Sequence, residues 1–246
     1  MIGFGSDPSA QPPGLRGVIF DMDGVLVDSH ATHRRAWRLF LDSLGRHHLD
    51  SDLDFILDGH KRDDILRHFF GDIPDRQLEE FGKQKDSIFQ QIQLTVSAVP
   101  GAVRLVRDLH TRGACLAVAT SASRCRAQFT LAQLGLLSHF QALVTGDDVL
   151  RGKPDPAIYR LACDRMQIEA KYLVAVEDAV SGVRAAVASG LACIGIALHQ
   201  PPERLLAAGA LHVVSDFTTL NSDDIENILL SRGRDGDRSA ISSIKC

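Results

Sequence analysis

The sequence predicts an α/β protein, with a Rossmann-like parallel sheet, helices on both faces of that sheet, and an inserted all-helical domain. Three observations predict this fold. A short apolar run, residues 17–20, stops abruptly at an acidic residue, which is typical of a buried parallel strand. Residues 29–97 then show only helical periodicity. From residue 100 onward, helix and strand patterns alternate, which predicts a parallel sheet covered on both faces.

The individual elements follow from the spacing of apolar residues. Within residues 29–97, apolar side chains share a helical face around residues 37–44, 65–70 and 78–92. Later helices are expected at residues 102–110, 124–134, 156–166 and 180–189. Strands are expected at residues 17–20, 114–119, 142–144, 172–176, 193–197 and 211–214.

Domain boundaries follow from the same patterns. Residues 14–28 and 98–231 are expected to form the α/β core, and residues 29–97 the helical domain. Residues 1–13, rich in Gly, Ser and Pro, are expected to be a disordered tail. The polar residues 232–246 are expected to be a second, flexible tail.

The composition argues against several classes of protein. The 246 residues carry a formal net charge of −4, so the basic footprint of a nucleic-acid-binding protein is absent. No apolar run approaches the ~20 residues of a membrane helix, and the first residues do not resemble a signal peptide. The five cysteines are scattered, without C-x-x-C spacing. We therefore expect a cytoplasmic protein with reduced thiols, a monomer or weak homodimer that binds neither nucleic acid nor membrane.

Polar side chains that can bind phosphate or metal follow four of the expected strands. Ligands of open α/β sheets bind at the carboxyl ends of the strands, so the fold would bring these residues to one edge. They are Asp21 and Asp23, Thr120 and Ser121, Asp147 and Asp148, and Glu177 and Asp178.

The segment Asp21-Met22-Asp23-Gly24 offers two carboxylates just past a strand, and Gly24 gives the chain freedom to turn. The first carboxylate can attack phosphorus, while the second can give a proton to the leaving group and later take one from water. The structural alternative is a capping aspartate followed by a turn aspartate, because D-x-D-G alone is a common pattern.

Three further segments can complete a phosphate site. The hydroxyls of Thr120, Ser121 and Ser123 precede a helix and can bind an anion, although they can equally be ordinary N-caps. Lys153, between a glycine and a proline, can neutralise crowded carboxylates or remain a surface lysine. The oxygen-rich pair Glu177-Asp178, together with Asp21, suits Mg²⁺, whereas helix-terminal acids are the structural alternative.

The segments DMDGVLVDS, ATSAS, GKPDP and VEDAVSG, in this order and spacing, resemble the four motifs of the haloacid dehalogenase superfamily over residues 15–230. The resemblance implies that the helical insertion is a cap domain like that of β-phosphoglucomutase and phosphoglycolate phosphatase relatives. It implies that Asp21 is the nucleophile and a metal ligand, and that Asp23 is the general acid/base and binds Mg²⁺ through its backbone carbonyl. Thr120 or Ser121 would supply the hydroxyl of the second motif, and Lys153 the cation of the third. Glu177 and Asp178 would be the metal-binding acids.

The cap is expected to carry part of the substrate site. His33 and Arg62 are similar to mutase-like positions, and Arg62 can hold a second, non-transferring phosphate or be a surface cation. Trp37 is expected to be a core residue. The expected substrate-binding residues are His33, Arg62, Lys85, Ser123 and Gly24.

The expected activity is Mg²⁺-dependent removal of phosphate from a small phosphorylated metabolite, a sugar phosphate by preference, through an aspartyl phosphate. The acid at Asp23 favours phosphoryl transfer over carbon–halogen chemistry, because an alkoxide leaving group needs a proton and a halide does not. A β-phosphoglucomutase-like phosphosugar mutase is the first alternative. A non-catalytic binding protein is the second, and it would be expected to have lost Asp21, Asp23 or Lys153.

Overall fold

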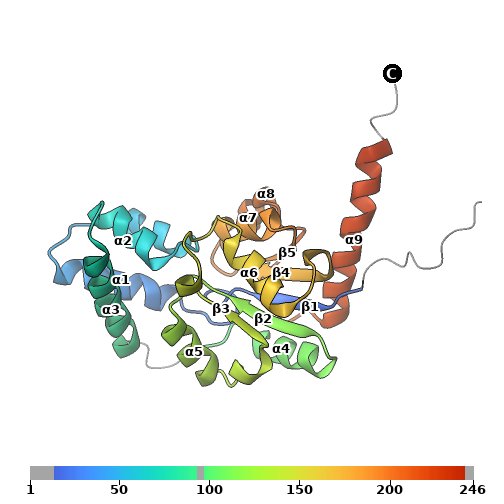
Figure 1. Cartoon of the computed structure of the whole chain (residues 1–246), viewed down its shortest axis with the longest axis horizontal. Helices are drawn as coiled ribbons and strands as arrows, with labels where there is room; N and C mark the ends of the chain where they lie inside the picture. Colours follow the sequence, from blue (N-terminus) through green and yellow to red (C-terminus); the bar gives the residue numbers. More distant parts are fainter. Residues whose placement is uncertain (1–13, 93–96, 242–246) are drawn as a thin grey trace, which may run out of the picture.

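The computed structural model describes residues 14–92 and 97–241, and within them six parallel strands form one sheet in the order β3-β2-β1-β4-β5-β6 (Figure 1). The predicted α/β fold class is confirmed. Strand boundaries lie within two residues of those expected, namely Gly17–Phe20 (β1), Cys115–Ala119 (β2), Ala142–Val144 (β3), Leu173–Glu177 (β4), Ala192–Ile196 (β5) and His212–Val214 (β6).

Helices cover both faces of the sheet because successive side chains of each strand point to opposite sides. Val18 and Phe20 of β1 belong to one apolar cluster with residues of α4, α5 and α9, whereas Ile19 belongs to another with residues of α6, α7 and α8. These helices are α4 (Ala102–Thr111), α5 (Arg124–Gln133), α6 (Ala157–Met166), α7 (Val180–Ala188), α8 (Pro202–Ala208) and α9 (Ser222–Ile241).

Residues 30–92, called here the helical insertion, lie beside the sheet (Figure 1). They contain α1 (His30–Ser43), α2 (Arg62–Phe70), α3 (Asp75–Ile92) and two short 3-10 segments, Asp50–Leu53 and Phe55–Leu57. An apolar cluster of their own, with Trp37 and Phe40 fully enclosed, stabilises their packing. Trp37 is therefore a core residue, as the sequence predicts.

The C-terminal region differs from the sequence-based expectation. Helix α9 continues to Ile241, through residues predicted to be a flexible tail from residue 232. The Asn221 side chain accepts the backbone N–H groups of Asp223 and Asp224 and so caps the helix, and Ile225 is buried against the core. Once such a helix is started, each added residue gains one hydrogen bond, so a polar sequence can continue it. The predicted disordered tail, residues 1–13, lies outside the described residues, as do residues 242–246.

The position of β1 in the sheet determines where the site forms. The strand order reverses at β1, which has β2 on one side and β4 on the other. The register pairs Phe20 with Val118 of β2 and with Val176 of β4. The next residue of each strand, Asp21, Ala119 and Glu177, therefore reaches the carboxyl edge at the same level, which is the usual ligand position in this architecture.

Within the described residues, no helix has the length and apolar character needed to cross a membrane.

Candidate active site

Lys153 lies at the centre of the carboxyl edge and is almost completely buried. Its Nζ donates to Asp21 Oδ1 at 2.6 Å, to Glu177 Oε1 at 2.5 Å and to the Ala119 carbonyl at 3.2 Å. Burial alone would lower the pKa of Lys153, but the carboxylates of Asp21 and Glu177 outweigh it and hold the pKa above its ordinary value. Lys153 is therefore a fixed cation beside Asp21, and the surface-lysine alternative is wrong for this residue.

Glu177 is fully buried and its carboxylate is held from several sides. Besides Lys153, the Tyr159 hydroxyl donates to Oε1 at 2.6 Å. The backbone N–H groups of Asp178 and Ala179 donate to Oε2 at 3.1 and 3.4 Å. Because four donors fix this carboxylate, Glu177 orients Lys153 in addition to any role it has at a metal.

A group of three buried acids fits a divalent cation. Asp21, Glu177 and Asp178 each offer a carboxylate oxygen, and these oxygens lie within 4.8 Å of one another. Burial raises the pKa of Asp21 well above its ordinary value, the neighbouring acids add to this effect, and Lys153 opposes it. Three carboxylates so close together need more positive charge than Lys153 supplies, and hard oxygen donors suit Mg²⁺. The residues present therefore fit the predicted ion.

His30 lies against the third acid of this group. Its Nε2 is 2.8 Å from Asp178 Oδ2, while its buried Nδ1 has no hydrogen-bond partner in the part of the chain that the structure describes. Gly24, with φ of +76°, packs tightly behind this pair, and a Cβ there would come within 1.9 Å of Asp178 Oδ2. Gly24 does not line the pocket, so its position favours a backbone role over the predicted substrate contact.

The Asp23 carboxylate is bound mainly by Arg126 of α5. Arg126 binds its carboxylate with two hydrogen bonds, at 2.9 and 2.6 Å, the Ser29 hydroxyl donates to Oδ1 at 2.6 Å, and His33 Nε2 lies 3.2 Å from Oδ1. Burial would raise the pKa of Asp23, but Arg126 and His33 outweigh it and hold the pKa well below its ordinary value. The contact of Asp23 with Mg²⁺ through its backbone carbonyl stays a prediction.

Sequence reasoning missed Arg126 and Ser29. Arg126 is buried, although arginine is rarely so, and its planar guanidinium matches a carboxylate with two parallel hydrogen bonds. One signal could have found it. Arg126 precedes Ala127 and lies one helical turn before Thr130 and Leu131, which form the buried face of α5.

Thr120 and Ser121 both line the pocket, so the alternative registers of this motif stay open. The Thr120 hydroxyl accepts the Ala122 N–H at 3.2 Å. The Ser121 hydroxyl donates instead to the carbonyl of Gly59 in the helical insertion at 2.7 Å. Ser181 of α7 donates to the neighbouring carbonyl of Asp58. The carbonyls of Asp58 and Gly59 thus bind two serines that follow different strands of the sheet.

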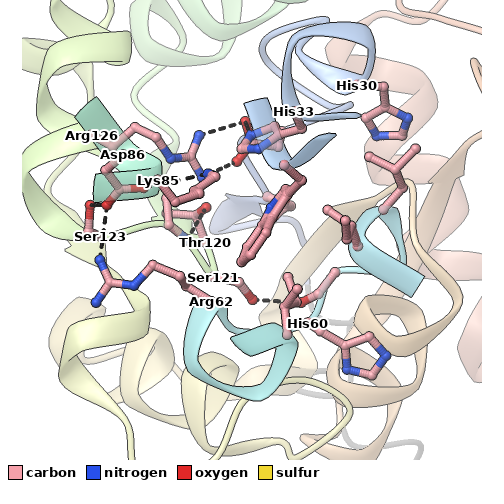
Figure 2. Close-up of a pocket in the computed structure, with 18 of the residues that line it drawn as sticks. His30, His33, His60, Arg62, Lys85, Asp86, Thr120, Ser121, Ser123 and Arg126 are labelled. Carbon is pink, nitrogen blue, oxygen red and sulfur yellow. Dashed lines mark hydrogen bonds and ion pairs between the residues drawn. The ribbon is translucent and has the colours of Figure 1, made fainter. Parts of the chain in front are cut away.

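The insertion supplies the opposite wall of the pocket with His33, Arg62 and Lys85 (Figure 2). Burial lowers the pKa of His33 to about 3, so its imidazole is neutral at ordinary pH. Lys85 is buried, with its Nζ 5.3 Å from the ring centre of Trp37 and 5.0 Å from that of Phe89. Arg62 donates to Asp86, a residue without a role in the predicted motifs.

The pocket brings together residues from both parts of the chain. Most of the predicted residues line it, namely Asp21, Asp23, His33, Arg62, Lys85, Thr120, Ser121, Ser123 and Asp178. Lys153 and Glu177 lie directly behind Asp21. Asp147 and Asp148 lie apart, because they bind the Arg124 backbone and side chain at the start of α5.

The family model of the haloacid dehalogenase-like hydrolases matches residues 15–190. The chain belongs to this family. The resemblance of its four motifs is thereby confirmed.

Two relatives and one solved structure show how close this hydrolase is to other members. It is 32% identical over 207 residues to validoxylamine A 7'-phosphate phosphatase of Streptomyces hygroscopicus subsp. limoneus, covering 78% of this chain and 91% of the relative. It is 31% identical over 227 residues to phosphorylated carbohydrates phosphatase of Thermotoga maritima, covering 84% and 97%. β-Phosphoglucomutase of Clostridium difficile shares the fold, with a TM-score of 0.79 at 21% identity, over 89% of this chain and 98% of that one.

Proposed function

We propose that this hydrolase removes phosphate from a small phosphorylated sugar, with Asp21 as nucleophile and Mg²⁺ as cofactor. The observation that carries the proposal is the position of Asp21, which lines the pocket beside a buried cation and two further acids. The two phosphatases reported above act, by their names, on phosphorylated carbohydrates or a phosphorylated validoxylamine, and this supports the substrate class.

The reaction proceeds in two transfers. An Asp21 oxygen forms a bond to phosphorus as the bond to the leaving alkoxide breaks, and Asp23 gives that alkoxide its proton. Asp23 then takes a proton from water, whose oxygen attacks phosphorus and releases phosphate and free Asp21. Lys153 stabilises negative charge next to Asp21 throughout. Asp21, Glu177 and Asp178 would hold Mg²⁺, which would neutralise negative charge on the phosphoryl oxygens when bound.

Arg126 sets a condition on the proton-donor step. A carboxylate held by two guanidinium hydrogen bonds is ionised, which suits the removal of a proton from water. For Asp23 to donate a proton first, its pair with Arg126 has to loosen when substrate enters. Arg126 is thus a positioning residue for Asp23.

The helical insertion acts in this proposal as a cap over residues 14–28 and 98–231. Its loop at Asp58 and Gly59 accepts hydrogen bonds from Ser181 and Ser121 of the core. These bonds hold the insertion over the pocket. A closed pocket excludes water and strengthens the charge interactions around the phosphate.

Hydrolysis of an aryl phosphate with and without Mg²⁺ tests the proposal. The wild-type protein is expected to release phosphate only with Mg²⁺, and Asp21→Asn to lose turnover by a factor of about 10³ or more. Asp72→Asn is a matched control, since Asp72 is an exposed aspartate and the charge change is the same. Retained turnover in Asp21→Asn, or equal rates after chelation, would contradict the proposal.

A phosphosugar mutase is the second candidate, and the placement of His33 and Arg62 on the insertion wall of the pocket favours it. A mutase keeps its phosphoenzyme from water and binds a bisphosphate in two orientations. Incubation with β-glucose 1-phosphate and a trace of the bisphosphate separates the two activities. Formation of glucose 6-phosphate without free phosphate would select the mutase, and free phosphate would select the hydrolase.

A further inference from the structure

The part of the pocket lined by Arg62, Lys85 and Ser123 contains a carboxylate that the proposed reaction does not use. Asp86 lies on α3 and lines the pocket with Arg62, Lys85 and Ser123 (Figure 2). Its side chain is 17% exposed, so it faces the pocket interior more than bulk solvent. A partly buried carboxylate of this kind needs a reason, because its desolvation is costly.

Asp86 already accepts hydrogen bonds from the side chains that a second phosphate would need as donors. Its Oδ2 accepts from Arg62 Nη1 at 3.0 Å and from the Ser123 hydroxyl at 3.3 Å, and its Oδ1 lies 3.5 Å from Lys85 Nζ. These three groups come from α2, from the loop before α5, and from α3 itself. The charge of Arg126 also acts on Asp86, but the guanidinium of Arg126 is bound to Asp23.

The charge in this part of the pocket decides which chemical group fits there. Burial would raise the pKa of Asp86, but Lys85, Arg126 and Arg62 outweigh it, so Asp86 is an anion. A phosphate or carboxylate placed on Arg62 would stand beside this anion, and like charges repel strongly in a partly buried site. A hydroxyl group can instead donate to Asp86 and accept from Arg62 or Lys85 at the same time.

We infer that Asp86 is a specificity-determining residue that makes this part of the pocket select uncharged, hydroxyl-bearing groups. The preferred substrates are therefore monophosphates of sugars or polyols, and bisphosphates and phosphorylated sugar acids are excluded. This inference rests on the proposed function and narrows its substrate class. It also opposes the mutase alternative, because Asp86 takes the place beside Arg62 where a second phosphate would bind.

Inhibition of aryl phosphate hydrolysis by fructose 6-phosphate and fructose 1,6-bisphosphate tests the inference, since the two ligands differ only by the second phosphate. The wild type is expected to be inhibited about tenfold more strongly by the monophosphate. Asp86→Asn, which keeps the shape but removes the charge, is expected to lower that preference at least about tenfold, with each inhibition measured relative to the variant's own aryl phosphate turnover. Asp63→Asn is the matched control, because Asp63 also contacts Arg62 but does not line the pocket.

The outcomes distinguish a failure of the proposed function from a failure of the role assigned to Asp86. A lack of aryl phosphate turnover in the wild type defeats the proposed function itself. Three wild-type results overturn only the role of Asp86, provided that aryl phosphate is turned over. They are equal inhibition by both ligands, stronger inhibition by the bisphosphate, and inhibition by neither. These results count even if Asp86→Asn does not fold. An unchanged preference in a folded Asp86→Asn also overturns it.

Discussion

The charge on Lys85 depends on where its side chain lies. Burial lowers the pKa of Lys85 to about 8, an effect that Asp86 opposes and Arg126 strengthens. Most lysines keep their proton far above this pH, but Lys85 loses it close to neutral conditions. Because Lys85 lines the pocket, its protonation is expected to affect the binding of an anionic substrate.

We predict that KM for a phosphorylated substrate rises as pH increases through about 8. Below this pH Lys85 is a cation that attracts the substrate, and above it the attraction is lost. The measurement is KM against pH for the wild type, for Lys85→Gln and for Lys83→Gln, an exposed lysine on the same helix. Lys85→Gln should lack the step and Lys83→Gln should keep it, whereas a step that persists in Lys85→Gln would contradict the assignment.

The sequence predicts the residues of the site that follow strands but misses several on helices. Asp21, Lys153 and Asp178 follow from strand ends and from the resemblance of their motifs. Arg126 and Asp86 lie on helices among other charged residues, where the usual expectation is an exposed side chain. The packing of α3 and α5 against the pocket shows that both side chains face inward. For Arg126, its helical spacing from the buried residues of α5 is the one sequence signal of this position.

Gly182 and Gly82 both lie in helices, but a Cβ added at each position would meet a different kind of neighbour. A Cβ at Gly182 of α7 would come within 2.1 Å of the Glu177 carboxylate, which four hydrogen bonds hold in place. A Cβ at Gly82 of α3 would come within 2.5 Å of the Arg62 guanidinium, which is the end of a flexible chain. The two positions therefore separate a rigid obstacle from a movable one.

Gly182→Ala is predicted to lower the free energy of unfolding by about 1–3 kcal/mol, since overpacking against Glu177 exceeds the gain in helix propensity. Gly82→Ala is predicted to leave it unchanged or to raise it by up to about 1 kcal/mol, because Arg62 can move away. Denaturant unfolding of both variants measures the difference. A Gly182→Ala protein as stable as the wild type would show that Glu177 is not fixed as described.

Strands and the longer amphipathic helices of the core follow from the sequence, but α8 and α9 do not. Helix α8 has only seven residues, too few for a periodic pattern to stand out. The C-terminal part of α9 has a polar sequence without the apolar periodicity that predicts a helix. The N-terminal part of α9 depends on the Asn221 cap and on burial of Ile225. Tertiary packing supplies what local pattern lacks.

The molecule as a whole combines a sheet whose carboxyl edge carries the three-acid group and Lys153 with an insertion that supplies the opposite wall of the pocket. Both parts have apolar cores of their own, so each can keep its shape while they meet at the pocket. The three-acid group at the sheet edge brings three carboxylates close together, and their mutual repulsion opposes folding. A cation that binds this group in the folded chain should therefore stabilise the whole molecule.

Mg²⁺ is predicted to raise the thermal unfolding midpoint relative to the same protein in chelator. Saturation at about 100 times Kd would add about 2.7 kcal/mol to the free energy of unfolding. Asp178→Asn should lose this increment and Asp72→Asn, the exposed control, should retain it. An equal increment in Asp178→Asn would place the stabilising ion elsewhere.

Trapping the phosphoenzyme tests most directly whether Asp21 attacks phosphorus. The variant Asp23→Asn is suited to it, because an aryl leaving group needs no proton donor, whereas the water that cleaves the intermediate needs Asp23 as base. After acid quenching of a reaction with labelled aryl phosphate, we predict close to one labelled phosphoryl group per chain, on the peptide that contains Asp21. Release of the aryl alcohol without protein-bound phosphate, or label on any other peptide, would contradict it.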